Sequence, residues 1–552
     1  MSLFSGLYVG SSGLVTNQNA LNTTAHNLSN IGTTGYTRQQ IVQAERHYDT
    51  IGEAAVAPQQ VGLGVSYADV RSVRDYFLDK AYRQEFGRSE YYSTNYNAIT
   101  EMETLFGELQ GVAFQDSMAE LDRAVQELAK VPEDATNQGL LMSKSQTFLE
   151  RAQALYNGLA DYQDNLNEQI KSNIDKINDY GKKIREINLK VAGIEAGGIE
   201  RANDLRDARD QMLDELSGLA KISYDEDIHG VVSVQIEGAD FVTPDYVNEM
   251  GYLTGEEYNE FFSEDIDDGN KLPVDDHFYV PVWPRYKNQE VLSTSETISS
   301  DKNTDIGALK ALYNARGNKR ATYRDMYPKG ETYEFGNRTV TINTEAESAQ
   351  WYNATTGRSS IMSVMAEFDN LIHGIVTGMN KVLSSNGTPE GGNEDHLLFA
   401  RISTDKIDDG TDGWSTANLM INPDVQKTPT LLNNGFVLDD GSRDQQKADA
   451  LIKLFTDSFS TLNPNMGTPL NFASYYSSIV SENATNGKVY NSISFNQQAM
   501  VQSLDSQRQE VVGVSDSDEL TQMIRYQNAY NASSRYINTI NAMIDTLFNS
   551  MT

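Results

Sequence analysis

The segment MSLFSGLYVGSSGLVTNQNALNTTAHNLSNIGTTGYT, residues 1–37, contains no Asp, Glu, Lys or Arg, although 22% of the whole chain is charged. Leucines recur at every seventh position, at Leu7, Leu14, Leu21 and Leu28, and Leu3 and Ile31 extend the same apolar stripe. A seven-residue apolar spacing predicts a helix that turns one narrow seam toward another helix. The rest of its surface is uncharged, so several sides can be buried without desolvating an ion. Such a helix suits a subunit whose end packs inside an assembly.

The last part of the sequence repeats this pattern. Apolar residues recur at every seventh position and on the adjoining face: Met523, Tyr526, Tyr530, Ile537, Ile540, Ile544, Leu547 and Met551. Each segment has room for a helix of about 30 residues, roughly 45 Å long. Ordinary core packing explains a single apolar stripe, but two nearly charge-free stripes most simply pair with each other. We therefore predict an inner coiled-coil domain formed by residues 1–40 and 515–552, with the middle of the chain looping outward.

The overall composition limits the class of protein. The chain has 552 residues, a net charge of −34 and no cysteine, which excludes disulfides, thiolate metal sites and a cysteine nucleophile. An acidic chain without a basic face is not expected to bind nucleic acid. No apolar run reaches the roughly 18 residues of a membrane span, so we expect no membrane insertion. The first residues lack the basic and apolar regions of a Sec-type signal peptide, so export would need another route.

The middle of the chain predicts a mainly α fold with a β-rich insertion. Few helix signals and several Gly make residues 38–72 extended or β-hairpin. Helical spacing is found over 75–109, 114–131, 142–191, 205–219, 360–384 and 472–512. We group 41–221, 346–390 and 471–514 as a long-helix bundle, 222–345 as an outer β-rich domain, and 385–470 as a second outer excursion of mixed structure.

Residues able to carry catalysis or bind metal show no recognisable arrangement. The six histidines lie far apart, and the sequence has no HExxH helix, phosphate loop or GxSxG elbow. Two acidic turns, at 265–269 and 408–413, depart from EF-hand spacing and are better explained as solvated surface turns. We expect no catalytic residue, cofactor or metal site, and no enzyme activity.

The residues that end the first helix carry a family signature. Residues 25–38 read AHNLSNIGTTGYTR and resemble the N-terminal motif of the bacterial flagellar rod, hook and hook-associated proteins. The matching positions are Ala25, Asn27, Asn30, Thr33, Gly35, Tyr36 and Arg38. YQNAY at 526–530, ASSR at 532–535 and NDLRD at 203–207 are similar to the hook-associated protein 1 branch of this family. The length also agrees with that branch.

This resemblance implies a structural subunit at the junction between the flagellar hook and filament, required for filament assembly. It implies export by the flagellar type III system and assembly outside the cell into a ring with copies of itself. The ring's partners would be the hook protein on one side and hook-associated protein 3 on the other. Before assembly, an export chaperone would bind the exposed C-terminal helix, because isolated helices of this length are marginal in water.

Other functions are not excluded by the sequence. A hook or distal-rod subunit shares the N-terminal motif, although the C-terminal segment and the length speak against it. An adhesin-like surface module would use the aromatic stretch 241–286 for contact, although a β-domain core explains those residues better. A surface protease displayed on a flagellar scaffold is disfavoured by the missing catalytic motifs.

Overall fold

The computed structural model describes residues 3–53, 58–107, 114–198, 200–268, 271–293, 296–335, 338–390, 396–403, 413–436 and 444–551. Its residues form two compact units, each drawn from separate stretches of the chain. Unit 1 comprises Met1–Ser89, Lys176–Glu249 and Gln497–Thr552, and unit 2 comprises Glu90–Asp175 and Met250–Asn496. Within the described ranges, no helix is both long and apolar enough to cross a bilayer.

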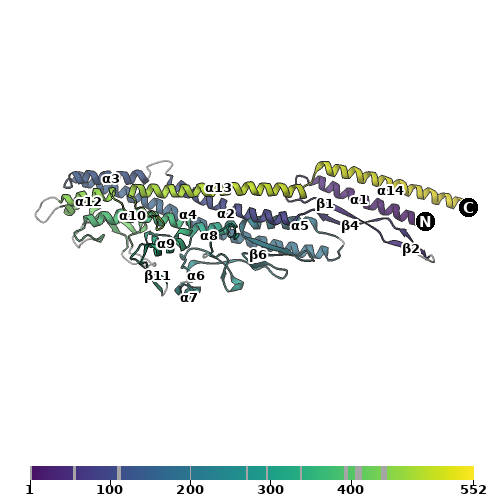
Figure 1. Cartoon of the computed structure of the whole chain (residues 1–552), viewed down its shortest axis with the longest axis horizontal. Helices are drawn as coiled ribbons and strands as arrows, with labels where there is room; N and C mark the ends of the chain where they lie inside the picture. The colour runs from purple at the N-terminus through teal and green to yellow at the C-terminus, as the bar shows by residue number, and fades with distance from the viewer. Residues whose placement is uncertain are drawn as a thin grey trace. The chain divides into compact units, whose positions relative to one another are not determined.

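Unit 1 consists of helices, a long hairpin and a small sheet (Figure 1). Its elements are α1 (Leu3–Ser29), β1 (Gln39–Glu45), β2 (Tyr48–Glu53), β3 (Pro58–Gly62), β4 (Val65–Ser72), α5 (Asn203–Leu219), β5 (Ile222–Glu226), β6 (Val232–Ile236), β7 (Ala239–Val242) and α14 (Asp516–Met551). It also holds the first part of α2 (Tyr76–Phe106) and the last parts of α4 (Ala135–Glu195) and α13 (Phe472–Val512).

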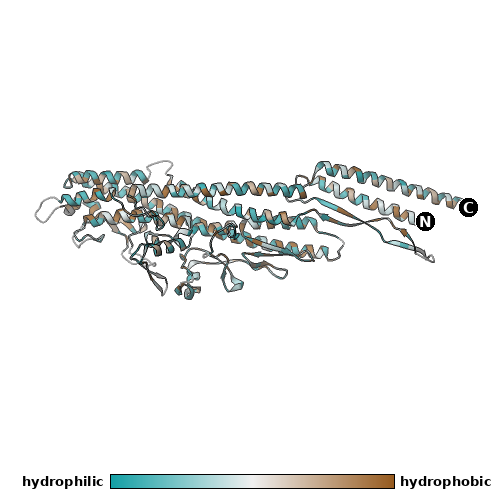
Figure 2. Cartoon of the chain, viewed as in Figure 1, coloured by the Kyte–Doolittle hydropathy of each residue, from teal (hydrophilic) through white to brown (hydrophobic). Residues whose placement is uncertain are grey.

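The terminal helices α1 and α14 lie side by side and run antiparallel (Figure 1). Glycines make the close approach possible. A Cβ on Gly10 would lie 2.7 Å from Cγ1 of Ile537, and one on Gly6 would lie 3.2 Å from Cδ1 of Ile540. Both helices mix apolar and polar residues along their length (Figure 2). The predicted pairing partners are therefore correct, and the coiled-coil geometry stays a prediction.

The most buried side chains along α1 belong to small residues rather than to leucines. Thr16, Ala20 and Thr24 of α1 are at most 4% exposed. The predicted stripe residues Leu7, Leu14, Leu21 and Leu28 flank these small residues and are only half-buried. The side chain of Leu3 lies outside the described residues, and Ile31 follows the end of α1 and is 51% exposed.

The hairpin of β1 and β4 packs on α1, which confirms the extended structure expected for residues 38–72. The amide of Val65 donates to Oγ of Ser12 at 3.2 Å. Gly64 has a φ of +92°, and a Cβ there would lie 2.1 Å from the same oxygen. Glycine is needed at this turn, both for its backbone conformation and for the close contact.

Strands β5, β6 and β7 form an antiparallel sheet that belongs to unit 1. Asn188 of α4 fixes β6 by donating to the carbonyl of Val232 at 2.8 Å and accepting from its amide at 3.2 Å. The unit boundary after Glu249 thus falls inside the segment 222–345 that the sequence analysis treats as one domain. The finer four-part division stays a prediction.

Unit 2 is built on helices, with small sheets of two or three strands between them in its described ranges. Its helices are α3 (Phe114–Lys130), α6 (Gly255–Phe261), α7 (Ser263–Asp267), α8 (Ala308–Arg316), α9 (Glu345–Ala354), α10 (Ser360–Leu383), α11 (Pro423–Lys427), α12 (Gln445–Thr456) and 3₁₀ helices η1–η5 (Pro284–Tyr286, Tyr323–Met326, Thr356–Arg358, Thr416–Asn418, Pro429–Phe436). Its strands are β8 (Gly251–Leu253), β9 (Val280–Trp283), β10 (Gln289–Glu290), β11 (Thr332–Phe335), β12 (Arg338–Thr341), β13 (Phe399–Arg401) and β14 (Leu419–Ile421).

Rings from separate helices form much of the unit 2 core. The centroid of the Phe114 ring lies 5.1 Å from that of Phe368, 5.0 Å from that of Tyr476 and 5.5 Å from that of Phe148. These separations are typical of favourable aromatic pairs. The helices that carry these rings coincide with the helical segments predicted from sequence spacing.

One carboxyl group buried in this core accepts hydrogen bonds from neutral side chains. Glu367 of α10 is 3% exposed. Its Oε1 accepts from Nδ2 of Asn463 at 3.2 Å and from the hydroxyl of Tyr352 at 3.4 Å. The same Asn463 nitrogen lies 3.4 Å from Oε2 of Glu482. Burial, and then the charge of Glu482, raise the pKa of Glu367 to about 8, so this group is protonated at neutral pH.

The stability of unit 2 is expected to fall as the pH rises from 4.5 to about 8 and to level off above that. A carboxyl pKa that is raised in the folded state gives stability that is present at low pH and is lost as the pH rises through that pKa. The loss is at most about 1.4 kcal/mol per pH unit. Glu367→Gln should flatten this dependence, measured by thermal unfolding and by hydrogen-exchange protection of the α10 amides. Glu260→Gln, at an exposed position of α6, is the control. Equal slopes for wild type and Glu367→Gln would refute the assignment.

Candidate functional site

The motif residues 25–38 end α1 and lead into β1. The amide and Nδ2 of Asn30 both donate to the carbonyl of His26, at 3.2 and 3.0 Å, which closes the last helical turn. Thr33 donates its hydroxyl to Oδ1 of Asn30 at 3.1 Å. Gly35 has a φ of +79°, a conformation that favours glycine. Asn30, Thr33 and Gly35 therefore shape the turn, whereas Ala25 is exposed.

Asn27 is the centre of the site. It is 1% exposed and its amide uses both donors and both acceptor positions. Nδ2 donates to the carbonyl of Gln39 at 2.8 Å and to Oε2 of Glu519 at 3.1 Å. Oδ1 accepts from the hydroxyl of Tyr36 at 2.7 Å and from the amide of Gln39 at 2.9 Å. An asparagine side chain can make no more hydrogen bonds than these.

Glu519 and Arg38 complete the contact between the two ends of unit 1. The Glu519 side chain is 4% exposed, and its Oε1 lies 3.3 Å from Nε of Arg38. The backbone amide of Arg38 donates to the carbonyl of Val512 at 2.8 Å. We call Asn27, Tyr36, Arg38, Gln39 and Glu519 the motif joint. It links the end of α1, the start of β1, the end of α13 and the start of α14.

A second set of polar residues, which we call the ionic cluster, is connected to the motif joint through Thr37. Arg83 is 3% exposed and lies 2.6 Å from Asp214 and 3.0 Å from Asp210. Arg508 of α13 lies 2.8 Å from Asp79 and 2.7 Å from Asp214. The cluster comprises Arg74, Asp79, Arg83, Asp207, Asp210, Asp214 and Arg508.

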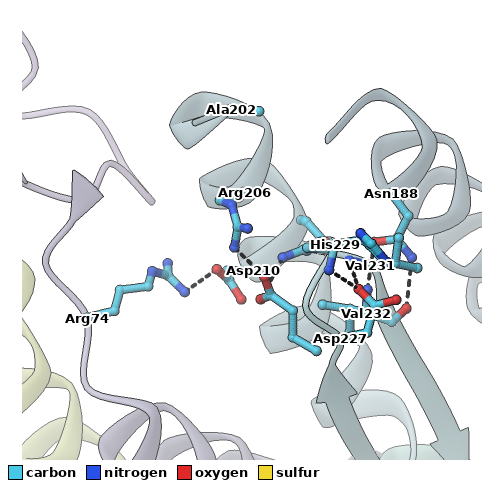
Figure 3. A network of polar contacts seen from close by, with 12 residues as sticks. Arg74, Asn188, Ala202, Arg206, Asp210, Asp227, His229, Val231 and Val232 are labelled. Carbon is cyan, nitrogen blue, oxygen red and sulfur yellow. Dashed lines mark hydrogen bonds and ion pairs between the residues drawn. The ribbon is translucent and has the colours of Figure 1, made fainter. Parts of the chain in front are cut away.

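Thr37 connects the motif joint to the ionic cluster. It is 1% exposed, and its amide donates to Oδ2 of Asp207 at 2.9 Å. Its hydroxyl accepts from Nη2 of Arg74 at 3.3 Å. Arg74 in turn pairs with Asp210, and Figure 3 shows these two side chains pointing toward each other. The turn after Gly35 is thereby fixed to α5.

Burial and ion pairing set the protonation of this cluster. Burial raises the pKa of Asp210, but Arg74, Arg83 and Arg209 outweigh it and hold the pKa below its usual value. For Asp207 burial dominates and raises the pKa to about 6, against the hydrogen bonds from Thr37. Buried charges that are paired in this way fix geometry. The ionic cluster therefore has a structural role. Within the described ranges, no group of three or more His, Cys, Asp or Glu side chains is arranged to hold a metal ion.

Arg209, two residues after the NDLRD segment, helps to hold the β5–β6 hairpin. Arg209 donates to Oδ1 of Asn188 at 3.0 Å and to the carbonyl of Gly230 at 2.6 Å. Oδ1 of Asp227 accepts from the amides of His229 and Val231, both at 2.9 Å. Figure 3 shows this network between α4, α5 and the hairpin.

The predicted seam of α14 is incompletely covered within the chain. Ile540 is 8% exposed, whereas Leu547 is 49% exposed. The other predicted seam residues are half-buried: Met523, Tyr526, Tyr530, Ile537 and Ile544. The side chain of Met551 lies outside the described residues.

Most of the second acidic turn, expected at 408–413, also lies outside the described residues, which omit 404–412.

The motif can be recognised in the sequence, but the residues that contact it cannot. In the sequence, Glu519 is only one acidic residue in the first turn of a nearly uncharged helix. The helix dipole alone accounts for an acidic residue at that position. Asp79, Arg83, Asp214 and Arg508 carry no local pattern, because their partners come from distant parts of the sequence.

Asn27→Ala is expected to lower the free energy of unfolding of unit 1 by about 2 kcal/mol, because it removes two hydrogen bonds to the Gln39 backbone and one of the two partners of Glu519. Asn22→Ala, at an exposed position of the same helix, should have little effect. Chemical denaturation followed by circular dichroism measures both. Equal effects of the two substitutions would contradict the role given to Asn27.

Comparison with known proteins identifies related chains over the whole length. The family model described as flagellar hook-associated protein FlgK helical domain matches residues 99–277. Residues 7–37 match the flagella basal body rod protein model, and residues 505–550 match the flagellar basal body rod FlgEFG protein C-terminal model. The last two matches contain Asn27 and Tyr36 on one side of the motif joint and Glu519 on the other.

Several curated relatives share one description. Flagellar hook-associated protein 1 of Bacillus subtilis (strain 168) is 23% identical over 565 residues, covering 100% of this chain and 99% of that protein. The proteins of that description from Salmonella typhimurium and Escherichia coli (strain K12) are each 23% identical, covering 98% of both chains in each pair.

A solved structure has a similar fold. The flagellar hook junction protein FlgK from Burkholderia pseudomallei matches with a TM-score of 0.51 and 12% identity, over 78% of this chain and 100% of that chain. The full-length relatives and the helical-domain model agree with this structural match. Over its whole length the chain is similar to flagellar hook-associated protein 1, and these matches support a structural role in the bacterial flagellum.

Proposed function

We propose that this protein forms the junction between the flagellar hook and filament. Copies of it would assemble into a ring that contacts the hook protein on one side and hook-associated protein 3 on the other. It would reach this place outside the cell through the flagellar type III export system. Its role would be structural, without enzyme activity.

The observation that carries this proposal is the incomplete burial of the apolar stripe on the uncharged helix α1. Leu7, Leu14, Leu21 and Leu28 stay half-exposed even though α14 and the hairpin already pack on α1. An apolar stripe that remains partly open on a helix without charges favours burial against another copy. Neighbouring copies would cover this stripe in the ring.

A hook or distal-rod subunit is the second candidate, because the models that match both termini are named for rod proteins. The match of residues 99–277 to the hook-associated helical domain favours the junction. An adhesin-like role has weaker support, since Phe241 and Phe278 in the aromatic stretch are 0% exposed and belong to cores.

A strain that lacks the gene tests the assignment. We expect hooks without filaments in electron micrographs, together with flagellin released into the medium. Missing hooks would instead support the rod or hook candidate, and intact flagella would refute both.

The same strain tests the leucine stripe. The double variant Leu14→Gln/Leu21→Gln should be exported but should fail to restore filaments, because polar side chains would interrupt the surface offered to neighbouring copies. Ile228→Gln, at a 95% exposed position in the β5–β6 turn, should restore them fully. Normal filaments with the double variant would contradict the proposal that this stripe packs between copies.

We further propose that an export chaperone binds the last turns of α14. Met543, Leu547 and Phe548 are 50%, 49% and 60% exposed, which suits capture of a helix in an apolar groove.

Leu547→Ser/Phe548→Ser should weaken chaperone binding at least tenfold in calorimetry, because these substitutions remove apolar surface. Tyr8→Ser, at a 65% exposed position of α1, should leave the affinity unchanged. Unchanged affinity after removal of residues 515–552 would refute the C-terminal location altogether.

A further inference from the structure

The motif joint connects segments that lie very far apart in the sequence. Asn27 and Glu519 are 492 residues apart, yet they share a buried hydrogen bond. The two sides of the motif joint supply each other's partners. Both side chains that contact the Glu519 carboxylate come from the N-terminal segment: Asn27 donates an amide N–H, and Arg38 provides a cation.

The burial of Glu519 makes this dependence strong. Its side chain is 4% exposed, and a buried carboxylate without partners is costly. When α14 is undocked, Glu519 is hydrated and one Nδ2 donor of Asn27 is without its acceptor. Docking of α14 therefore forms the Arg38 pair and the Asn27 bond together.

Residues 37 and 38 are positioned to transmit this docking to the rest of unit 1. The amide of Arg38 bonds to Val512 of α13 at 2.8 Å, and its carbonyl accepts from Val73 at 2.9 Å. The adjacent Thr37 is bonded to Asp207 and Arg74. Displacing this dipeptide would thus disturb α5 and the end of α13 at the same time.

The link between α13 and α14 is short and closely packed. It contains Gly513, where a Cβ would lie 2.3 Å from the carbonyl oxygen of Gln509. Arg508, one turn earlier, is bound to Asp79 and Asp214 of the ionic cluster. The start of α14 is therefore held between the ionic cluster on one side and the motif joint on the other.

We propose that the motif joint is a conformational lock in which docking of α14, through Glu519 on Arg38 and Asn27, orders residues 30–39 and secures α5 and the end of α13. When α14 is undocked, the same turn loses its contacts with Glu519. The lock is a property of the single chain and does not depend on where the protein sits in the flagellum.

Hydrogen exchange on the full chain tests the lock. Glu519→Gln keeps the size of the side chain but removes its charge. We expect exchange of the amides of residues 37–39 to rise roughly tenfold to a hundredfold. A smaller rise should follow in α5, which does not touch Glu519. Glu510→Gln, at an exposed position near the end of α13, is the matched control and should leave both regions unchanged.

A double-mutant cycle separates coupling from simple loss of stability. Arg38→Met should resemble Glu519→Gln, and the double variant should exchange no faster than the faster single variant. Arg38→Lys, which keeps the cation, should recover part of the protection. Circular dichroism confirms that each variant retains its helices.

Two results would overturn the proposal. One is faster exchange confined to α14, with residues 37–39 and α5 protected as in wild type. The other is strict additivity of Arg38→Met and Glu519→Gln in the double variant. Either result would reduce the motif joint to a local ion pair.

Discussion

The terminal part of this protein depends on one buried amide. The single side chain of Asn27 forms hydrogen bonds with the backbone of a strand, with a tyrosine and with a glutamate. All of its donor and acceptor positions are used. This matters because α1 carries no charged residue with which to fix its position. Apolar contacts hold α1 against α14 but are not directional. The directional contacts at its end set where both helices lie.

Unit 1 uses two physically different kinds of packing. Along α1 and most of α14, glycines and other small residues let the backbones approach, and the buried charge of Glu519 lies only at the start of α14. Around α5, buried arginines and aspartates pair with each other from separate segments. Thr37 lies where the two meet. Uncharged helices can be surrounded by further apolar surface, whereas the paired charges specify one arrangement of the elements that carry them.

Much of the secondary structure could be predicted, because helical periodicity is local. The helices expected at 75–109 and 360–384 are found as α2 and α10. The motif, the pairing of the terminal helices and the family were also accessible. The ionic cluster was not, since Arg83 and Arg508 look like ordinary surface residues until the chain folds. The most buried positions of α1 are small residues, because an apolar period marks a face of a helix and does not show how closely another element approaches it. The unit boundary after Glu249 separates β7 from β8, and strands this close in the sequence carry no local signal that they belong to different units.

The 492-residue separation of Asn27 and Glu519 also bears on how the chain can vary. The entropy lost on closing a loop grows only with the logarithm of its length, so doubling the loop costs only about 0.6 kcal/mol. Insertions or deletions between the two residues would change the closure entropy very little. As far as closure entropy is concerned, the segments of unit 2 can therefore lengthen or shorten, provided that the two ends of unit 1 still meet.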